Sequence, residues 1–226
     1  MKAVVLAAGK GVRMMPLTKD KPKALVEYRG KALIEWVLAA LEKAGIERAG
    51  IVIGTNGGMV REALGERYGK TELEYFEQKG IGTGTAKSLE SAAEFCKGSD
   101  FLCINSDIVV ESALFSALME KRGFDAVISV RWSENCRRFG VVKVDGSHVA
   151  EVIEKPQGIK SGFINIGAYR FSPRVFGAIA ETGKSPRGEF ELTDSINLLV
   201  RGGGSAGFVE WKGKWKDIGT IEDLKE

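Results

Sequence analysis

The chain has 226 residues, and its 33 basic residues nearly balance its 30 acidic ones, which leaves a formal charge of +3. This mild charge, without a long block of one sign, argues against a surface dedicated to nucleic acid. The length suits one large α/β domain with a substantial core, so we expect a single domain over residues 1–226. Three cysteines without a C-x-x-C spacing, no apolar run long enough to span a membrane and no signal-peptide pattern predict a cytoplasmic protein that does not engage a membrane.

The opening stretch, residues 1–26, combines a strand pattern with a glycine-rich turn and two separated basic residues. An apolar run at residues 3–6 predicts a buried strand, and the small residues at 7–11 follow at its end. Glycines there let the backbone approach a ligand closely, and exposed N–H groups can bind an anion. Arg13 and Lys23 add two positive charges. The stretch lacks the Walker and dinucleotide-binding patterns, so it suits either a polyphosphate site or an ordinary strand-to-loop turn.

Helical and strand patterns alternate through the rest of the first half. Apolar spacing predicts helices over residues 31–44, 59–68, 86–96 and 114–122, and strands over 50–54, 73–76, 101–105 and 125–131. This alternation predicts a mainly parallel sheet, whose ligands bind beyond the carboxyl ends of the strands. In the second half, strands are predicted over 138–144, 148–154 and 161–171, and a helix over 189–200. We interpret these strands as β-rich insertions on the main sheet.

Two further features stay ambiguous when they are judged by residue type alone. The glycine-rich loop at residues 80–86 suits either a ligand contact or a flexible turn with Thr85 as helix cap. Asp107, which follows a predicted strand, suits either a turn or a ligand for a hard cation. The single histidine, His148, lies at a predicted turn, and no nucleophile–histidine constellation can be built around it.

Longer strings of residues are more specific than these single features. Residues 6–26 read L-A-A-G-x-G-x-R-M-x-P-L-T-x-x-x-P-K-x-L-V, which resembles the signature of sugar-1-phosphate nucleotidylyltransferases. F-G at 139–140, E-K-P at 154–156, F-I-N-I-G-A-Y at 163–169 and W-x-D-I-G-T at 215–220 follow in the family's order. The resemblance implies an α/β fold with a Rossmann-like, mainly parallel or mixed sheet flanked by helices and carrying β-rich sugar-binding insertions. It also implies a nucleotide-binding half at about residues 1–130 and a sugar-phosphate half at about 131–226.

The resemblance implies a role for each matching residue. The implied nucleotide-binding residues are Leu6, Ala7, Ala8, Gly9, Gly11, Gln78, Gly82 and Thr83. The implied catalytic cations are Arg13, Lys23 and Lys155, the implied sugar contacts are Gly140, Glu154 and Asn165, and the implied Mg²⁺ ligands are Asp107 and Asp217. The E-x-T-D string at 191–194 is also usual in the family, and we interpret it as structural or close to the sugar, outside the catalytic set. The chain departs from the family at Ser106, where glycine is usual, and at Gln78, which lies about one residue nearer Gly82 than the pattern places it.

These residues predict an enzyme that converts a nucleoside triphosphate, with UTP or dTTP favoured, and a sugar 1-phosphate to a nucleotide sugar and pyrophosphate. Because a sugar 1-phosphate is already anionic, this chemistry needs no general base. Three other functions stay open: a cytidylyltransferase for phosphocholine or inositol phosphate, a mannose-1-phosphate guanylyltransferase, and a catalytically silent nucleotide-sensing subunit. The expected partners are the two substrates. The sequence leaves open whether the chain forms a homo-oligomer and whether it is a stand-alone enzyme or part of a longer parent.

Overall fold

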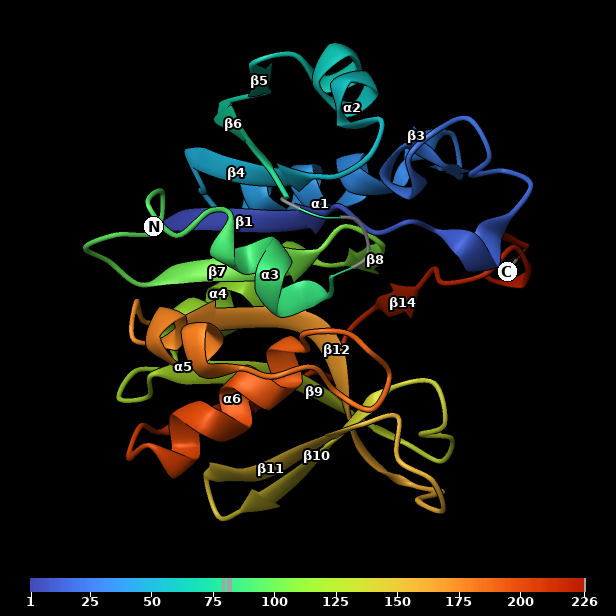
Figure 1. Cartoon of the computed structure of the whole chain (residues 1–226). Coiled ribbons are helices and arrows are strands. Elements are labelled where there is room, and N and C mark those ends of the chain that lie inside the picture. Colours follow the sequence, from blue (N-terminus) through green and yellow to red (C-terminus); the bar gives the residue numbers. More distant parts are fainter. Residues whose placement is uncertain (79, 81–82, 226) are drawn as a thin grey trace.

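A mixed β-sheet runs through the centre of the computed structural model, which describes residues 1–78, 80 and 83–225 (Figure 1). In the described part of the chain the sheet has ten strands, in the order β10-β11-β13-β9-β12-β7-β1-β4-β6-β5. Its strands are β1 Lys2–Ala7, β4 Arg48–Ile53, β5 Arg67–Tyr68, β6 Thr71–Glu77, β7 Phe101–Asn105, β9 Ala126–Ser133, β10 Gly140–Asp145, β11 His148–Glu154, β12 Gly162–Phe171 and β13 Ala206–Glu210. Two short pairs lie outside this sheet: β2 Glu27–Tyr28 with β3 Lys31–Ala32, and β8 Ile108–Val110 with β14 Trp215–Asp217.

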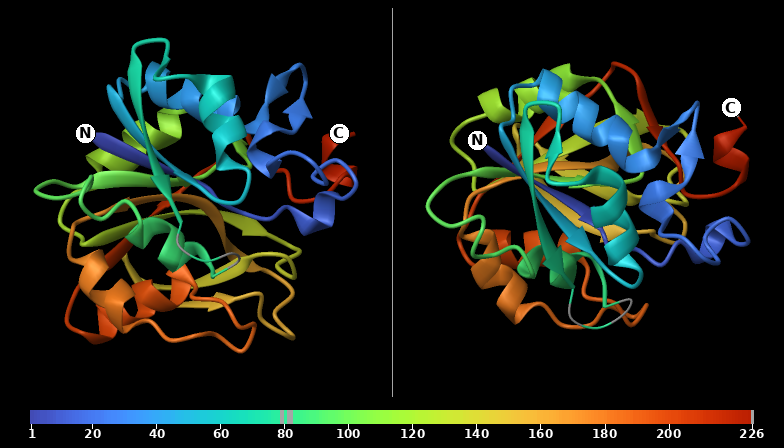
Figure 2. Two further views of the ribbon diagram at one scale, coloured as in Figure 1. Left: turned by 45° about the horizontal axis from the view of Figure 1, so that its top comes forward. Right: turned by 90° about the horizontal axis from the view of Figure 1, so that it is seen from above.

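Helices cover both faces of the sheet (Figures 1 and 2). The α-helices are α1 Leu33–Lys43, α2 Gly57–Leu64, α3 Thr85–Glu90, α4 Ser112–Glu120, α5 Val175–Glu181 and α6 Leu192–Arg201. Short 3₁₀ helices are η1 Val12–Met14, η2 Lys23–Leu25 and η3 Glu222–Leu224. Buried side chains of α1, α2 and α4 join one core cluster, and those of α3, α5 and α6 join another on the opposite face.

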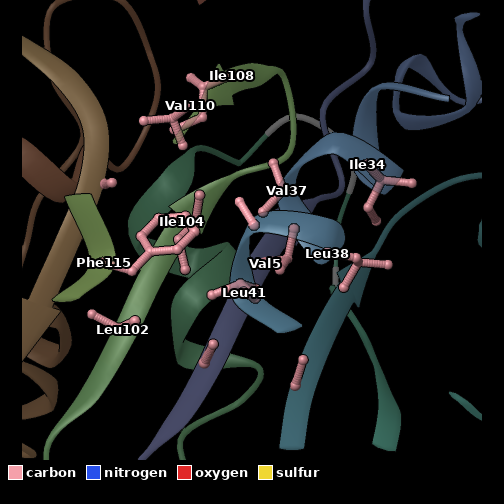
Figure 3. Packing of buried hydrophobic residues seen from close by; sticks show 14 of the residues in the cluster. Val5, Ile34, Val37, Leu38, Leu41, Leu102, Ile104, Ile108, Val110 and Phe115 are labelled. Carbon is pink, nitrogen blue, oxygen red and sulfur yellow. The ribbon is translucent and has the colours of Figure 1, made fainter. Parts of the chain in front are cut away.

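The side chains of β1 alternate between these two cores. Val5 packs in the cluster under α1, whereas Val4 and Leu6 pack in the cluster under α3 and α6. Successive residues of a strand point to opposite faces, so a strand buried on both faces is apolar throughout. Figure 3 shows the first core, where Val37 and Leu41 of α1 lie over the central strands. This double burial explains why the opening stretch begins with an uninterrupted apolar run.

The predicted α/β fold with a mixed sheet and flanking helices is confirmed. β4, β1 and β7 are parallel neighbours, and β6 continues the parallel part beyond β4. On the other side, β12 runs antiparallel to both β7 and β9. The hairpin of β10 and β11 pairs with β12 through β10, so the predicted β-rich insertions extend the same sheet.

Two predicted helices in the first half end several residues earlier than expected. The helix predicted over 59–68 begins at Gly57 and ends at Leu64, because Gly65 adopts a positive φ of 65°. Residues 67–68 instead form β5, which pairs antiparallel with β6. The helix predicted over 86–96 ends at Glu90, where the Ser91 hydroxyl donates a hydrogen bond to the carbonyl of Lys87.

The second half also differs from the predicted elements. The helix expected from residue 189 begins at Leu192, because the backbone N–H and C=O of Phe190 are bonded to Thr83 and Ala86. Helix α5 and strands β13 and β14 have no counterpart among the predicted elements, and neither does β8 in the first half. No helix within the described ranges is both long and apolar enough to cross a membrane.

Candidate active site

A cleft of about 610 Å³ opens at the carboxyl ends of β1 and β7 and is closed on its far side by β10, β11 and β12. The residues expected from the sequence that line it are Leu6, Ala7, Ala8, Gly9, Gly11, Arg13, Lys23, Gln78, Asp107, Gly140, Glu154, Lys155, Asn165 and Asp217. Thr83 does not line the cleft but touches a residue that does, and Gly82 lies outside the described residues. The sheet therefore brings segments from both halves of the chain to one place.

The glycine-rich turn after β1 makes room for a buried lysine. Gly11 adopts a positive φ of 64° and precedes η1, and its carbonyl accepts a hydrogen bond from the Thr18 hydroxyl at 2.8 Å. A Cβ added at Gly11 would lie 2.9 Å from Cβ of Lys23 and 2.9 Å from Cγ2 of Thr18. Glycine is therefore required at position 11 both for its backbone conformation and for space. Lys23 is only 8% exposed, whereas Arg13 is exposed at the cleft.

The two aspartates come together through a short antiparallel ladder. In the β8–β14 pair Asp217 is opposite Ile108, and the backbone N–H of Ile218 donates to the carbonyl of Asp107 at 2.9 Å. Asp107 directly precedes β8 and Asp217 ends β14, so both carboxylates lie at the same end of the ladder. The Lys23 ammonium forms an ion pair with the Asp107 carboxylate. Lys23 and two acidic groups thus meet at the floor of the cleft.

The charges at this point favour a further cation. Burial and the charge of Asp107 raise the pKa of Asp217 to about 6, despite the opposing effect of Lys23 and Arg138. Two neighbouring carboxylates repel each other when both are ionised, and a hard divalent cation relieves that repulsion. Mg²⁺ commonly takes one or two carboxylates and fills its other positions with water or phosphate oxygens. Asp107 and Asp217 fit that donor set.

Arg138 is a residue of the cleft that the motif comparison did not single out. Its Nη2 lies 2.7 Å from Oδ2 of Asp223 and 3.5 Å from Oδ2 of Asp217. Burial acts to raise the pKa of Asp223, but hydrogen bonds from Arg138 and Thr220 hold it well below its usual value. In the sequence, Arg138 directly precedes the F-G motif, and this position is the signal that could have pointed to it. A lone arginine in a loop carries little information by itself.

The opposite wall of the cleft is built from β10, β11 and β12. Gly140 is opposite Glu154 in the β10–β11 register, and a Cβ at Gly140 would lie 3.0 Å from Oε2 of Glu154. Asn165 donates from Nδ2 to the hydroxyl of the buried Tyr169 at 2.7 Å. Lys155 has a positive φ of 45°, and its ammonium lies 3.6 Å from Oε1 of Glu154. The three expected sugar contacts and the expected phosphate lysine are therefore neighbours.

A basic side chain joins two acidic ones beside this wall. Nη1 of Arg187 lies 2.9 Å from Oε1 of Glu191 and 3.2 Å from Oε1 of Glu154. Burial and the charge of Glu154 raise the pKa of Glu191 to about 7, although the charge of Arg187 acts in the opposite direction. The hydroxyl of Thr193 is buried and has no hydrogen-bond partner among the described residues. Glu191 and Thr193 belong to the E-x-T-D string and line the cleft, close to Gly140 and Glu154.

Gln78 lies at the mouth of the second glycine-rich loop. Its Nε2 donates to the Thr83 hydroxyl at 2.5 Å, and its Oε1 accepts from the Ser88 hydroxyl at 2.5 Å. The carbonyl of Thr83 accepts from the backbone N–H of Phe190 at 2.8 Å. The residues on either side of the undescribed part of this loop are thus bonded to helix α3 and to the segment that precedes α6.

Comparisons with known proteins agree with these features. The chain is 34% identical to the UTP–glucose-1-phosphate uridylyltransferase AglF of Haloferax volcanii, over all of this chain and 94% of AglF. It is also 34% identical to the low-salt glycan biosynthesis nucleotidyltransferase Agl11 of the same organism, over all of this chain and 64% of Agl11. A crystal structure from Bacillus anthracis, assigned to a glucose-1-phosphate thymidylyltransferase, matches all of this chain and 92% of its own with a TM-score of 0.88 and 27% identity.

Several relatives are longer than this chain. The chain spans 64% of Agl11 and about half, 53%, of the bifunctional GlmU protein of Methanococcus maripaludis. The family model described as nucleotidyl transferase matches residues 2–226, which is nearly the whole sequence. With that match and a nucleotidyltransferase one-third identical over the full chain, this protein is a member of the nucleotidyl transferase family.

Proposed function

We propose that this protein joins a nucleoside triphosphate and a sugar 1-phosphate, releasing pyrophosphate and forming a nucleotide sugar. The main support is that one cleft holds Lys23 with the two aspartates at its floor and Glu154 with Lys155 on its wall. A site for a polyphosphate and a site for a phosphorylated polyol are thus adjacent. UTP and dTTP are the favoured triphosphates, in agreement with the name of AglF and with the description of the Bacillus anthracis structure.

The reaction is an in-line displacement at the α-phosphorus. An oxygen of the sugar phosphate forms the new P–O bond, and the bond to the bridging oxygen of the β-phosphate breaks, so pyrophosphate leaves with the electron pair. Arg13 and Lys23 hold the triphosphate and stabilise charge on the leaving group, while Lys155 guides the incoming phosphate. The nucleophile is already an anion, so no side chain has to remove a proton. The exposed His148, which packs against Phe124, has no part in this chemistry.

Asp107 and Asp217 would hold Mg²⁺ in this site. When bound, the ion supplies positive charge that neutralises phosphate oxygens as the α-phosphorus becomes pentacoordinate. In the protein alone, Lys23 forms an ion pair with Asp107, which offsets part of the repulsion between the two carboxylates. Activity should therefore disappear on chelation with EDTA and return with added Mg²⁺.

Pyrophosphate release tests the proposal directly. The purified chain is incubated with UTP, dTTP, CTP, GTP or ATP against a panel of hexose 1-phosphates, mannose 1-phosphate, phosphocholine and inositol phosphate. Release with UTP or dTTP and a hexose 1-phosphate is expected. Preference for CTP with an alcohol phosphate, or for GTP with mannose 1-phosphate, would replace the proposed substrates by those alternatives. Triphosphate binding without turnover on any pair would instead indicate a silent nucleotide-sensing subunit.

A further inference from the structure

The turn that follows β14 is held by one arginine from the other side of the cleft. Arg138 lies just before β10, and its guanidinium donates to both carboxylate oxygens of Asp223, from Nη1 to Oδ1 at 3.1 Å and from Nη2 to Oδ2 at 2.7 Å. Paired N–H donors of this kind hold a carboxylate in one orientation and are stronger than single contacts. The Asp223 side chain is only 16% exposed. The Arg138 side chain is 42% exposed, so it is the paired geometry and the burial of Asp223 that constrain the contact more than an ordinary surface ion pair.

Asp223 in turn fixes the backbone just after Asp217. Its Oδ2 accepts hydrogen bonds from the backbone N–H of Gly219 at 2.9 Å and of Thr220 at 2.7 Å, and from the Thr220 hydroxyl at 2.9 Å. Ile218, between this turn and Asp217, is fully buried and bonded to the carbonyl of Asp107. The backbone around Asp217 is thus held on one side by the β8–β14 ladder and on the other by Asp223.

Arg138 also faces Asp217 itself. Its Nη2 lies 3.5 Å from Oδ2 of Asp217, compared with 2.7 Å from Asp223. The shorter contacts to Asp223 anchor the guanidinium, so a cation binding at Asp217 would not have to displace it. In both views of Figure 2 the C-terminal segment lies next to the loop after β1, which carries Arg13. The Arg138–Asp223 pair, here called the clamp, therefore joins the sugar-side wall to the acidic floor of the cleft.

We infer that Arg138 is a positioning residue that, through Asp223, holds the Asp217 carboxylate where it can ligate a divalent cation. Outer partners that orient a metal ligand typically matter roughly 10–100-fold in metal affinity. The inference rests on the proposed function for its effect on turnover. Its effect on cation binding and on backbone protection can be measured in the protein alone.

The test compares wild type with Arg138→Ala, Arg138→Lys, Asp223→Ala and the Arg138→Ala/Asp223→Ala double variant. Arg137→Ala is the matched control, because Arg137 is the exposed neighbour and does not line the cleft. Binding of Mn²⁺ is followed by the electron paramagnetic resonance signal of the free ion. Amide hydrogen exchange is followed over residues 217–223. Turnover is measured on the same samples with the substrate pair found above.

Both single alanine variants should bind Mn²⁺ roughly 10-fold more weakly and exchange faster over residues 217–223, while Arg137→Ala matches wild type. Because the two residues act as one unit, the double variant should be no worse than either single variant. Arg138→Lys should fail to restore binding, since an ammonium cannot reproduce the paired contact.

Other outcomes would overturn the inference. Additive losses in the double variant, full rescue by lysine, or wild type that binds no Mn²⁺ would each contradict a clamp on Asp217. Lost turnover in Arg138→Ala with unchanged Mn²⁺ binding and a normal Asp223→Ala variant would make Arg138 a direct substrate contact instead. If wild type turns over no substrate pair but Mn²⁺ binding and exchange respond as expected, the proposed function fails and the clamp stands.

Discussion

Replacing Lys23 by alanine should remove most of the activity without unfolding the protein. Lys23 is 8% exposed, lies at the start of η2 and pairs with Asp107, so its ammonium is held in place before any substrate binds. A charge that is already oriented costs no reorganisation when negative charge develops on the leaving group. Loss of one such group typically lowers kcat by roughly 10²–10³-fold, or about 3–4 kcal/mol of transition-state stabilisation.

The assay is steady-state pyrophosphate release at saturating triphosphate, with kcat and KM determined separately. Lys19→Ala is the matched control, because Lys19 is an exposed lysine of the same loop and does not line the cleft. Circular dichroism and the melting temperature check that both variants are folded. The assignment of Lys23 would be refuted by a folded Lys23→Ala enzyme whose kcat stays close to that of wild type and of Lys19→Ala.

Three further predictions concern other parts of the cleft. In initial-rate kinetics, Lys155→Ala should raise KM for the sugar 1-phosphate roughly 10–100-fold and leave KM for the triphosphate unchanged. The reason is that a lost hydrogen bond to a charged group is worth about 1.5–3 kcal/mol. The pKa of Glu191 is raised to about 7 in the folded state, so the folded protein binds this proton more tightly than the unfolded chain does. The contribution of Glu191 to the free energy of unfolding should therefore fall by roughly 3 kcal/mol as the pH rises from about 4.5 to about 7. Urea unfolding across that range should show this fall in wild type and not in Glu191→Gln; equal slopes would contradict it. Gly84→Ala should lower the free energy of unfolding by about 2 kcal/mol or more, because φ is 103° and the new Cβ would lie 2.4 Å from the carbonyl oxygen of Phe190. Gly58→Ala, in an open helical position, should instead be neutral or stabilising by up to about 1 kcal/mol in the same urea titration.

The alternation of helical and strand patterns, together with the family resemblance, was enough to predict the fold class. Strand β7 matches the predicted bounds, because a strand buried on both faces leaves an apolar run with clear ends. Helix bounds were less accurate, since they depend on single backbone conformations. A glycine with positive φ at position 65 ended α2, and two hydrogen bonds made by Phe190 delayed the start of α6.

The motif residues could be proposed from sequence because each motif is a short contiguous string. Their convergence could not be derived from spacing, because it depends on pairs of strands that are distant in the chain. The three-residue strands β8 and β14 are too short to give a periodic pattern, yet their pairing is what brings Asp107 to Asp217. Pairing two strands that are distant in the chain costs loop-closure entropy, which the contacts of the whole fold must offset, so no local pattern signals it.

The amino-acid sequence by itself therefore determined the family resemblance, the fold class and the candidate site residues, since these depend on local patterns of residue type. Only the tertiary structure decided which charges face one another. Arg138 and Arg187 occupy exposed loops and match no local pattern, but each bridges two carboxylates, and at least one carboxylate of each pair lines the cleft. The energy of a charge depends on the distance to its neighbours and on how far water is excluded, and both are properties of the folded chain.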